Sequence, residues 1–115
     1  MKVFTLTELD LDGGHREIAV EGELDLAVAE QLQEALARSE AEQTLLDFEA
    51  LEFIDSTGIA VIVQAHQRAA KEGRRVVVHS PRAQVLRVLT IAGLTENGLV
   101  MQTREQALSA TAPAS

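Results

Sequence analysis

Asp55, Ser56, Thr57 and Gly58 stand between two apolar segments, and they are the side chains of this chain whose types and spacing most suggest chemistry. The apolar stretch "IAVIVQA" follows them at once. Because serine before an apolar helix is a common N-cap, capping by Ser56 is the simplest interpretation. A hydroxyl at a helix N-terminus is also well placed to carry a phosphate, since the exposed amides and the macrodipole favour an anion there.

The same four residues fit the common enzyme motifs poorly. Aspartic proteases place glycine two residues after the acid and carry a second such motif, whereas Gly58 is three residues after Asp55 and the motif occurs once. Phosphoaspartate pumps carry lysine at the position of Ser56. A serine-hydrolase elbow needs glycine two residues before the serine, where this chain has Ile54. His66 lies about 280° round the helix from Ser56, so it is no general base for it. We expect no catalysis.

The composition and net charge of the chain disfavour some classes of binding partner. The chain has 115 residues, of which 46% are hydrophobic and 24% charged, which predicts one globular domain. Its net charge of −8 repels phosphate backbones and anionic lipids, and three Phe without Trp or Tyr provide no base-stacking surface. The longest apolar run, residues 59–63, is too short to span a membrane, and the first residues lack a signal-peptide cleavage site. We expect a cytoplasmic protein that binds neither nucleic acid nor membrane.

No metal or cofactor is expected either. The chain has no cysteine, which excludes disulfides and cysteine-ligated zinc. His15, His66 and His79 fall on a predicted turn, a helix and a strand end, with no metal-ligand spacing. Gly13 and Gly14 join two strands and do not open a helix, so they indicate a hairpin turn and not a phosphate loop.

Periodicity along the chain predicts an opening β-hairpin followed by alternating helices and strands. Residues 3–9 and 16–22 form the hairpin, residues 44–48 and 74–79 are buried interior strands, and a strand after a helix must pair in parallel. Helices are predicted at the following segments: 26–39, 57–72 ending before Gly73, and one capped by Ser80 with Pro81 first, whose apolar face ends at Gly93. Residues 98–101 suggest a last short strand, 103–110 a helical turn or two, and 111–115 a frayed terminus.

These elements predict an α/β fold with a mixed sheet of about five strands, an opening hairpin and helices packed on its face. The chain divides into a domain of residues 1–103 and a tail of residues 104–115, in which a short helix precedes a disordered end.

The combination of motifs resembles a family. "GELD" at 22–25, "LLDFEALEFIDSTGIAVIVQAH" at 45–66 and "AGLTE" at 92–96 are similar to the STAS domains of bacterial anti-sigma-factor antagonists. The resemblance covers about residues 3–101. Its most specific part is a buried strand ending in Asp, a short apolar connection, then Asp, Ser, Ser or Thr, and Gly before an apolar helix. Leu24 and Thr57 stand where Ile and Ser are frequent in the family.

The resemblance implies a function without catalysis. In that family the serine matching Ser56 is phosphorylated by an anti-sigma factor that is also a serine kinase with a histidine-kinase-like ATPase fold, and a phosphatase reverses the modification. Unphosphorylated antagonist binds the kinase and releases the sigma factor. We place the partner surface on the loop before the first helix, the connection at 49–53 and the exposed side of the helix after Ser56. The residues expected to bind the partner are Glu23, Asp25, Asp55, Ser56, Thr57, Gly58 and Gln64.

Other functions stay open. The same fold serves as a scaffold or transporter accessory subunit that needs no phosphorylation, or as a nucleotide-binding module near the helix start. Thr57 is a second candidate acceptor for a phosphate. Either a monomer or a weak homodimer fits the sequence.

Overall fold

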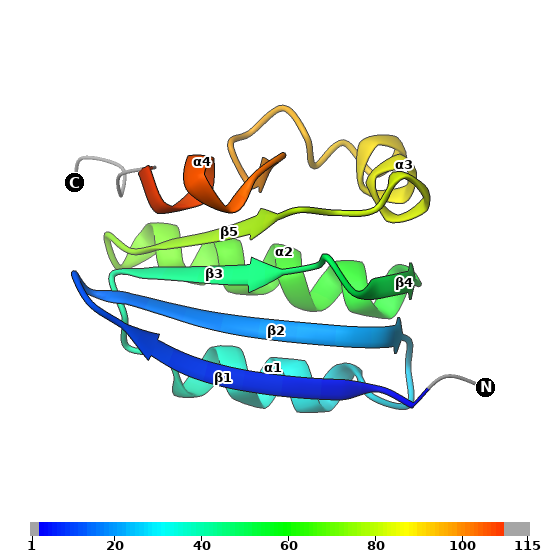
Figure 1. Cartoon of the computed structure of the whole chain (residues 1–115), viewed down its shortest axis with the longest axis horizontal. Helices are drawn as coiled ribbons and strands as arrows, with labels where there is room; N and C mark the ends of the chain where they lie inside the picture. Colours follow the sequence, from blue (N-terminus) through cyan, green and yellow to red (C-terminus); the bar gives the residue numbers. More distant parts are fainter. Residues whose placement is uncertain (1–2, 110–115) are drawn as a thin grey trace.

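The structure is a computed structural model that describes residues 3–109 and holds six strands and four helices (Figure 1). The elements, in chain order, are β1 (Thr5–Leu11), β2 (His15–Leu24), α1 (Ala29–Arg38), β3 (Gln43–Asp47), β4 (Leu51–Ile54), α2 (Ser56–Lys71), β5 (Arg75–His79), α3 (Ala83–Ile91), β6 (Val100–Met101) and α4 (Arg104–Ser109). None of the helices in this part of the chain combines the length and apolar character needed to cross a bilayer.

The sheet is mixed, as predicted. Its order is β1-β2-β3-β5-β6, and β4 pairs with β2 outside this path. The hairpin of β1 and β2 is antiparallel, whereas β2 with β3, β3 with β5, and β5 with β6 are parallel because a helix or long connection lies between them. Figure 1 shows the hairpin at one side of the sheet, with α1 and α2 crossing behind the strands.

One strand was missed in the sequence. Residues 49–53 were expected to be a connection, but Leu51–Ile54 is β4 and pairs in parallel with the end of β2. The pairing shifts register between Gly22 and Glu23, where the backbone N–H of Gly22 donates to the carbonyl of Ala50. Leu51 and Ile54 are buried and Phe53 is exposed, so the four residues do not alternate and carry no period-two signal.

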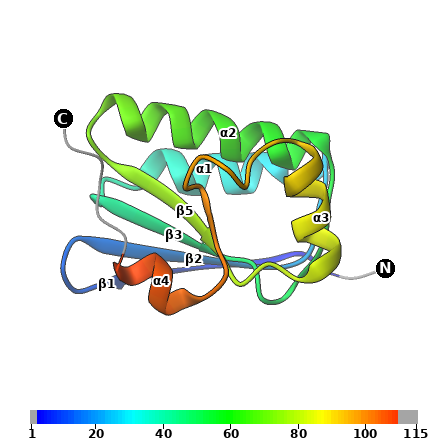
Figure 2. The same ribbon diagram turned by 90° about the horizontal axis from the view of Figure 1, so that it is seen from above.

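The two faces of the sheet carry different helices. In Figure 2, α1 and α2 lie on one face, α3 lies at one end and α4 lies on the other face. Leu46 and Val78 belong to the large core under α1, α2 and α3, whereas their neighbours Leu45 and Val77 pack with Ala107 of α4. These strand residues are fully buried, which confirms that residues 44–48 and 75–79 are interior strands.

The helix boundaries are partly as predicted. α2 and α3 end before Gly73 and Gly93, which both have positive φ angles. The segment 26–28, however, forms a turn before α1. Ser80 does not cap α3: it has a φ of 58°, and the helix begins two residues after Pro81, with Arg82 at the cap position and no side-chain cap bond.

The C-terminal segment is helical within residues 104–109, as predicted for 103–110. The expected frayed terminus at 111–115 lies outside the described residues. The division of the chain after residue 103 stays a prediction.

Candidate functional site at the start of α2

Asp55, not Ser56, caps α2. Its backbone is extended, and its carboxylate oxygen Oδ1 accepts hydrogen bonds from the backbone N–H groups of Thr57 at 2.9 Å and Gly58 at 3.0 Å. These amides are among the groups that a helix N-terminus leaves without an intrahelical partner. The expectation that Ser56 is the N-cap was therefore wrong, because an aspartate one residue earlier performs that role equally well.

Ser56 is the first residue of α2, and its side chain is exposed. Thr57 is half-buried and Gly58 is buried. Because Asp55 caps the helix, the Ser56 hydroxyl is not needed as an acceptor for the first amides of α2. Ser56 is therefore more accessible to a modifying enzyme than Thr57.

The loop before α1 lies beside the start of α2. The other Asp55 oxygen, Oδ2, accepts a hydrogen bond from the backbone N–H of Leu26 at 3.2 Å, and the backbone N–H of Asp55 donates to the carbonyl of Leu24. Asp25 is half-buried and closes the turn itself, because its side chain accepts from the N–H of Ala27. The structure thus brings together "GELD" and "DSTG", two segments about thirty residues apart in the chain.

Glu23 and Gln64 lie at two sides of this region. Glu23 is half-buried on β2, where it is in register with Phe53 of β4. Gln64 is exposed on α2, two turns after Ser56, and the exposed Ala60 lies between them. Because eight residues advance a helix by about 12 Å and turn it by about 80°, these three side chains form one exposed stripe.

Two exposed apolar side chains in this region were not singled out in the sequence. Leu26 is 74% exposed and Phe53 is 46% exposed. Both are close to Asp55. The backbone N–H of Leu26 donates a hydrogen bond to the Asp55 side chain, and Phe53 precedes Asp55 by two residues, in β4. Leu26 was assigned to a helix and Phe53 to a connection, so the pattern gave no sign that either faces outward.

The segments that meet at the start of α2 carry three acidic residues, Glu23, Asp25 and Asp55. A fourth acid, Glu52 of β4, lies 3.7 Å from the guanidinium of Arg82. The positive charge of Arg82 partly offsets the negative charge of Glu52. The region is therefore acidic, with apolar side chains at its border.

A pocket of about 460 Å³ lies away from this region. Its lining includes Leu36, Arg68 and Arg74, at the C-terminal ends of α1 and α2. It is separated from Ser56 by the length of α2. A nucleotide held there would not contact the start of the helix.

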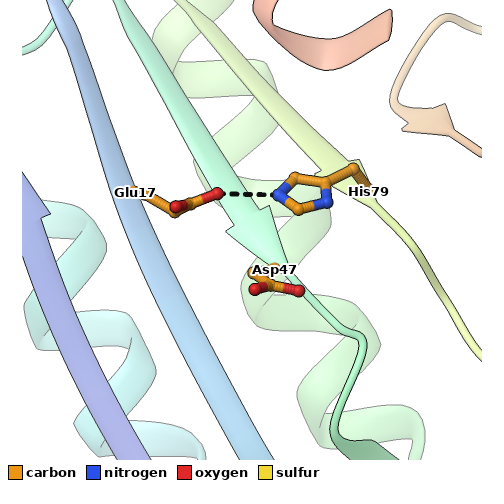
Figure 3. A group of neighbouring side chains, drawn as sticks. All are labelled: Glu17, Asp47 and His79. Carbon is orange, nitrogen blue, oxygen red and sulfur yellow. Dashed lines mark hydrogen bonds and ion pairs between the residues drawn. The ribbon is translucent and has the colours of Figure 1, made fainter. Parts of the chain in front are cut away.

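A second polar cluster lies on the face of the sheet that carries α4, and sequence spacing gave no sign of it. Glu17, Asp47 and His79 come from β2, β3 and β5, and each has a polar atom within 4.8 Å of the others (Figure 3). His79 is buried, its Nε2 lies 2.9 Å from Glu17 Oε2, and its Nδ1 lies 2.8 Å from the hydroxyl of Ser80. The polar positions of neighbouring strands were the only available signal, and they show proximity only once the register is known.

Arg104 pairs with the Glu17 carboxylate of this cluster. Its guanidinium donates to both oxygens of Glu17, at 2.9 and 3.1 Å. Burial acts to raise the pKa of Glu17, but the hydrogen bonds from Arg104 and then His79 outweigh it and hold that pKa below its usual value. Because both carboxylate oxygens are engaged, the cluster ties α4 to the sheet. His15 and His66 lie elsewhere, at the start of β2 and within α2.

The sequence of this chain is similar to proteins of one known family. Residues 7–107 match the family model "STAS domain". The chain is 30% identical over 81 residues to a protein of Paenibacillus polymyxa named anti-sigma F factor antagonist, an alignment that covers 67% of this chain and 69% of that protein. The chain belongs to the STAS domain family.

Solved structures share the fold. An anti-sigma factor antagonist from Mycobacterium paratuberculosis has a TM-score of 0.84 and 25% identity, with 95% of this chain and 94% of that chain covered. The anti-sigma factor antagonist SpoIIAA in its unphosphorylated form has a TM-score of 0.76 and 23% identity, covering 90% and 93%. SpoIIAA from Bacillus in its phosphorylated form has a TM-score of 0.72 and 21% identity, covering 90% and 96%. The mixed α/β architecture predicted from the sequence is thus confirmed.

Proposed function

We propose that this protein is an anti-sigma-factor antagonist that acts by partner switching. In its unphosphorylated state it binds an anti-sigma factor that is also a serine kinase, and the sigma factor is released. Phosphorylation of Ser56 ends the binding, and a phosphatase restores it. Support comes from membership of the STAS family and from the similarity to proteins named anti-sigma factor antagonists.

The exposed hydroxyl of Ser56 at the first position of α2 is the observation that carries this proposal. In the proposed step, Ser56 Oγ bonds to the γ-phosphorus of ATP, ADP leaves with the electrons of the broken phosphoanhydride bond, and the hydroxyl proton goes to a base on the kinase. This protein supplies the acceptor and no catalytic group. The partner therefore carries the ATPase domain, which we expect to be of the histidine-kinase-like type.

Phosphorylation adds about −1.5 to −2 charges at neutral pH. A helix N-terminus commonly stabilises an anion by about 0.3 to 1 kcal/mol, but at α2 the carboxylate of Asp55 already holds the amides of Thr57 and Gly58. The new charge therefore gains these amides only by displacing the Asp55 carboxylate. Across a partner surface, like-charge juxtaposition costs on the order of several kcal/mol, which converts a sub-micromolar complex into a largely dissociated one.

The partner surface proposed here is centred on Ser56. It includes Asp25 in the loop before α1 and the stripe that ends at Gln64 on α2. Exposed apolar atoms of Leu26 and Phe53 border it, and such side chains are common anchors in protein interfaces. Glu23, Thr57 and Gly58 complete the segment, although the burial of Gly58 limits it to a backbone contact.

The experiment needs the cognate kinase, sought first in the reading frames next to this one. Incubation with the kinase and ATP is expected to add one phosphate to the wild-type protein and none to Ser56→Ala, as measured by intact mass. Thr57→Ala serves as the matched control and should still gain one phosphate. A phosphate on Ser56→Ala would assign the acceptor elsewhere.

Measurements of kinase binding distinguish a phosphorylation switch from a scaffold that needs no phosphorylation. Ser56→Ala is expected to bind the kinase and to stay bound in the presence of ATP, whereas Ser56→Asp is expected to bind much more weakly. Normal kinase binding by Ser56→Asp, or complexes that ATP never dissociates in the wild-type protein, would contradict partner switching and favour a scaffold that needs no phosphorylation.

A further inference from the structure

One carboxylate joins the two segments of the proposed partner surface. Asp55 Oδ1 accepts from the N–H groups of Thr57 and Gly58, and Asp55 Oδ2 accepts from the N–H of Leu26. We call this carboxylate with its three amide donors the Asp55 bridge. It fixes the first turn of α2, which carries Ser56, relative to the turn at 25–28.

The bridge is the direct hydrogen-bond link from the turn at 25–28 to the start of α2. The other hydrogen bonds of the turn stay within it or run to α1. The Asp25 side chain accepts from Ala27, the Asp25 carbonyl accepts from Val28 and from Ala29 of α1, and the Val28 carbonyl accepts from Gln31 of α1. Within residues 3–109, the bond from Leu26 N–H to Asp55 is the hydrogen bond that joins this turn to α2. The Leu26 side chain is 74% exposed and adds little packing, whereas Val28 at the other end of the turn packs against the core. The Leu26 end of the turn is therefore the part that the bridge holds.

A phosphate on Ser56 would weaken the hydrogen bonds of the Asp55 bridge in two ways. Its charge would repel the neighbouring carboxylate of Asp55. Its oxygens would also compete with the Asp55 carboxylate for the amides of Thr57 and Gly58, because amides at a helix N-terminus are natural phosphate ligands. Either effect moves the carboxylate away from the position in which Oδ2 reaches Leu26.

We propose that Asp55 is the positioning residue of the switch, and that phosphorylation of Ser56 breaks the Asp55 bridge and frees the turn at 25–28. The modification then removes an ordered part of the binding surface, with the exposed Leu26 at its centre, in addition to placing charge in the interface. This inference rests on the proposed function, in which Ser56 is phosphorylated and the partner binds these two segments.

Amide hydrogen exchange measured by NMR tests the inference without a kinase, when phosphoserine is installed at position 56 during synthesis of the full chain. The loss of one charge-assisted hydrogen bond predicts about ten-fold faster exchange at the Leu26 amide. The ¹⁵N order parameter of Leu26 should fall as well, which gives a second readout if exchange is already fast. Phosphoserine at Ser109, exposed at the end of α4, is the matched control and should change neither value.

The variant Asp55→Asn separates the two oxygens. An asparagine retains one acceptor for the α2 amides, but its NH₂ group does not accept a bond from Leu26. Leu26 should therefore exchange faster in this variant without any phosphate, and phosphoserine at position 56 should add less than about two-fold, because the bond is already absent. The core amide of Val77 should be protected equally in all forms.

Unchanged Leu26 exchange and order in the phosphoserine-56 protein would overturn the inference, even if that protein no longer binds the kinase. In that case charge alone would explain the switch. If instead the phosphoserine-56 protein binds the kinase as tightly as the unmodified protein, the proposed function fails, whatever happens at Leu26.

Discussion

Gly58 of α2 lies so close to Leu24 of β2 that a Cβ atom at position 58 would come within 2.8 Å of Leu24 Cγ and 2.9 Å of Ile54 Cγ1. Leu24 is fully buried and Ile54 is 2% exposed, so neither side chain has space to retreat. The glycine in "DSTG" is therefore required by the close approach of helix and sheet. It places the start of α2, and Ser56 with it, directly beside the end of β2.

Gly58→Ala should destabilise the protein by about 1 to 3 kcal/mol, because an added methyl group overpacks this contact. Helix propensity alone predicts the opposite sign, a gain of up to about 1 kcal/mol. Urea unfolding measures the difference, with the exposed Gln64→Ala on the same helix as control. A stability gain in Gly58→Ala would show that α2 does not approach β2 this closely.

The cap assignment predicts unequal effects of two neighbouring residues on stability. Asp55→Ala should lower the free energy of unfolding by about 0.5 to 2 kcal/mol, because two amides of α2 and one of Leu26 lose their acceptor. Ser56→Ala should change it by less than about 0.5 kcal/mol, as for other exposed substitutions. The reverse order in urea unfolding would restore Ser56 as the N-cap.

The ion network of Glu17, His79 and Arg104 predicts a pH-dependent contribution to stability. Because the folded state holds the pKa of Glu17 below its usual value, its contribution is present above the unfolded value of about 4.3 and is lost as the pH falls through the folded pKa. Glu17→Gln should therefore be less stable than wild type by about 1 to 3 kcal/mol at pH 7, and the difference should shrink as the pH falls below about 4.3.

Unfolding of both proteins by urea at several pH values checks this expectation. Glu105→Gln, an exposed substitution on α4, provides the control. A difference between Glu17→Gln and wild type that stays constant from pH 7 to pH 3 would mean that the Glu17 charge is not involved.

The partner surface predicts which substitutions affect binding. Asp25→Lys, Gln64→Arg and Leu26→Ser should each weaken kinase binding by about ten-fold or more, about 1.4 kcal/mol, because they lie within the surface around Ser56. Ile91→Ser, at an 80% exposed position on α3, should leave affinity unchanged. If titration calorimetry shows the opposite pattern, the partner binds another face.

The interior strands were predictable because short apolar runs bounded by polar residues mark them. Residues 45–46 and 76–78 are such runs, and the structure buries them between α2 on one face of the sheet and α4 on the other. A strand as short as β4 carries no periodicity, and its pairing depends on a register shift at Gly22 that only the neighbouring strand reveals.

The start of α2 was predictable from the sequence, but the residue that caps it was not. "DSTG" identified the helix start, but whether Asp55 or Ser56 caps it depends on backbone angles that the residue types do not distinguish, since both are good caps. Ser80 illustrates the same limit, because serine before proline suggested a cap and the structure gives it a left-handed backbone. The Glu17–His79 pair, 62 residues apart, required the strand order.

Titration calorimetry of the cognate kinase against two forms of this protein, unmodified and phosphorylated once on Ser56, tests the central claim most directly. The account predicts that the single phosphate weakens binding by about 100-fold or more, the equivalent of several kcal/mol across the interface. Equal affinities for the two forms would contradict it.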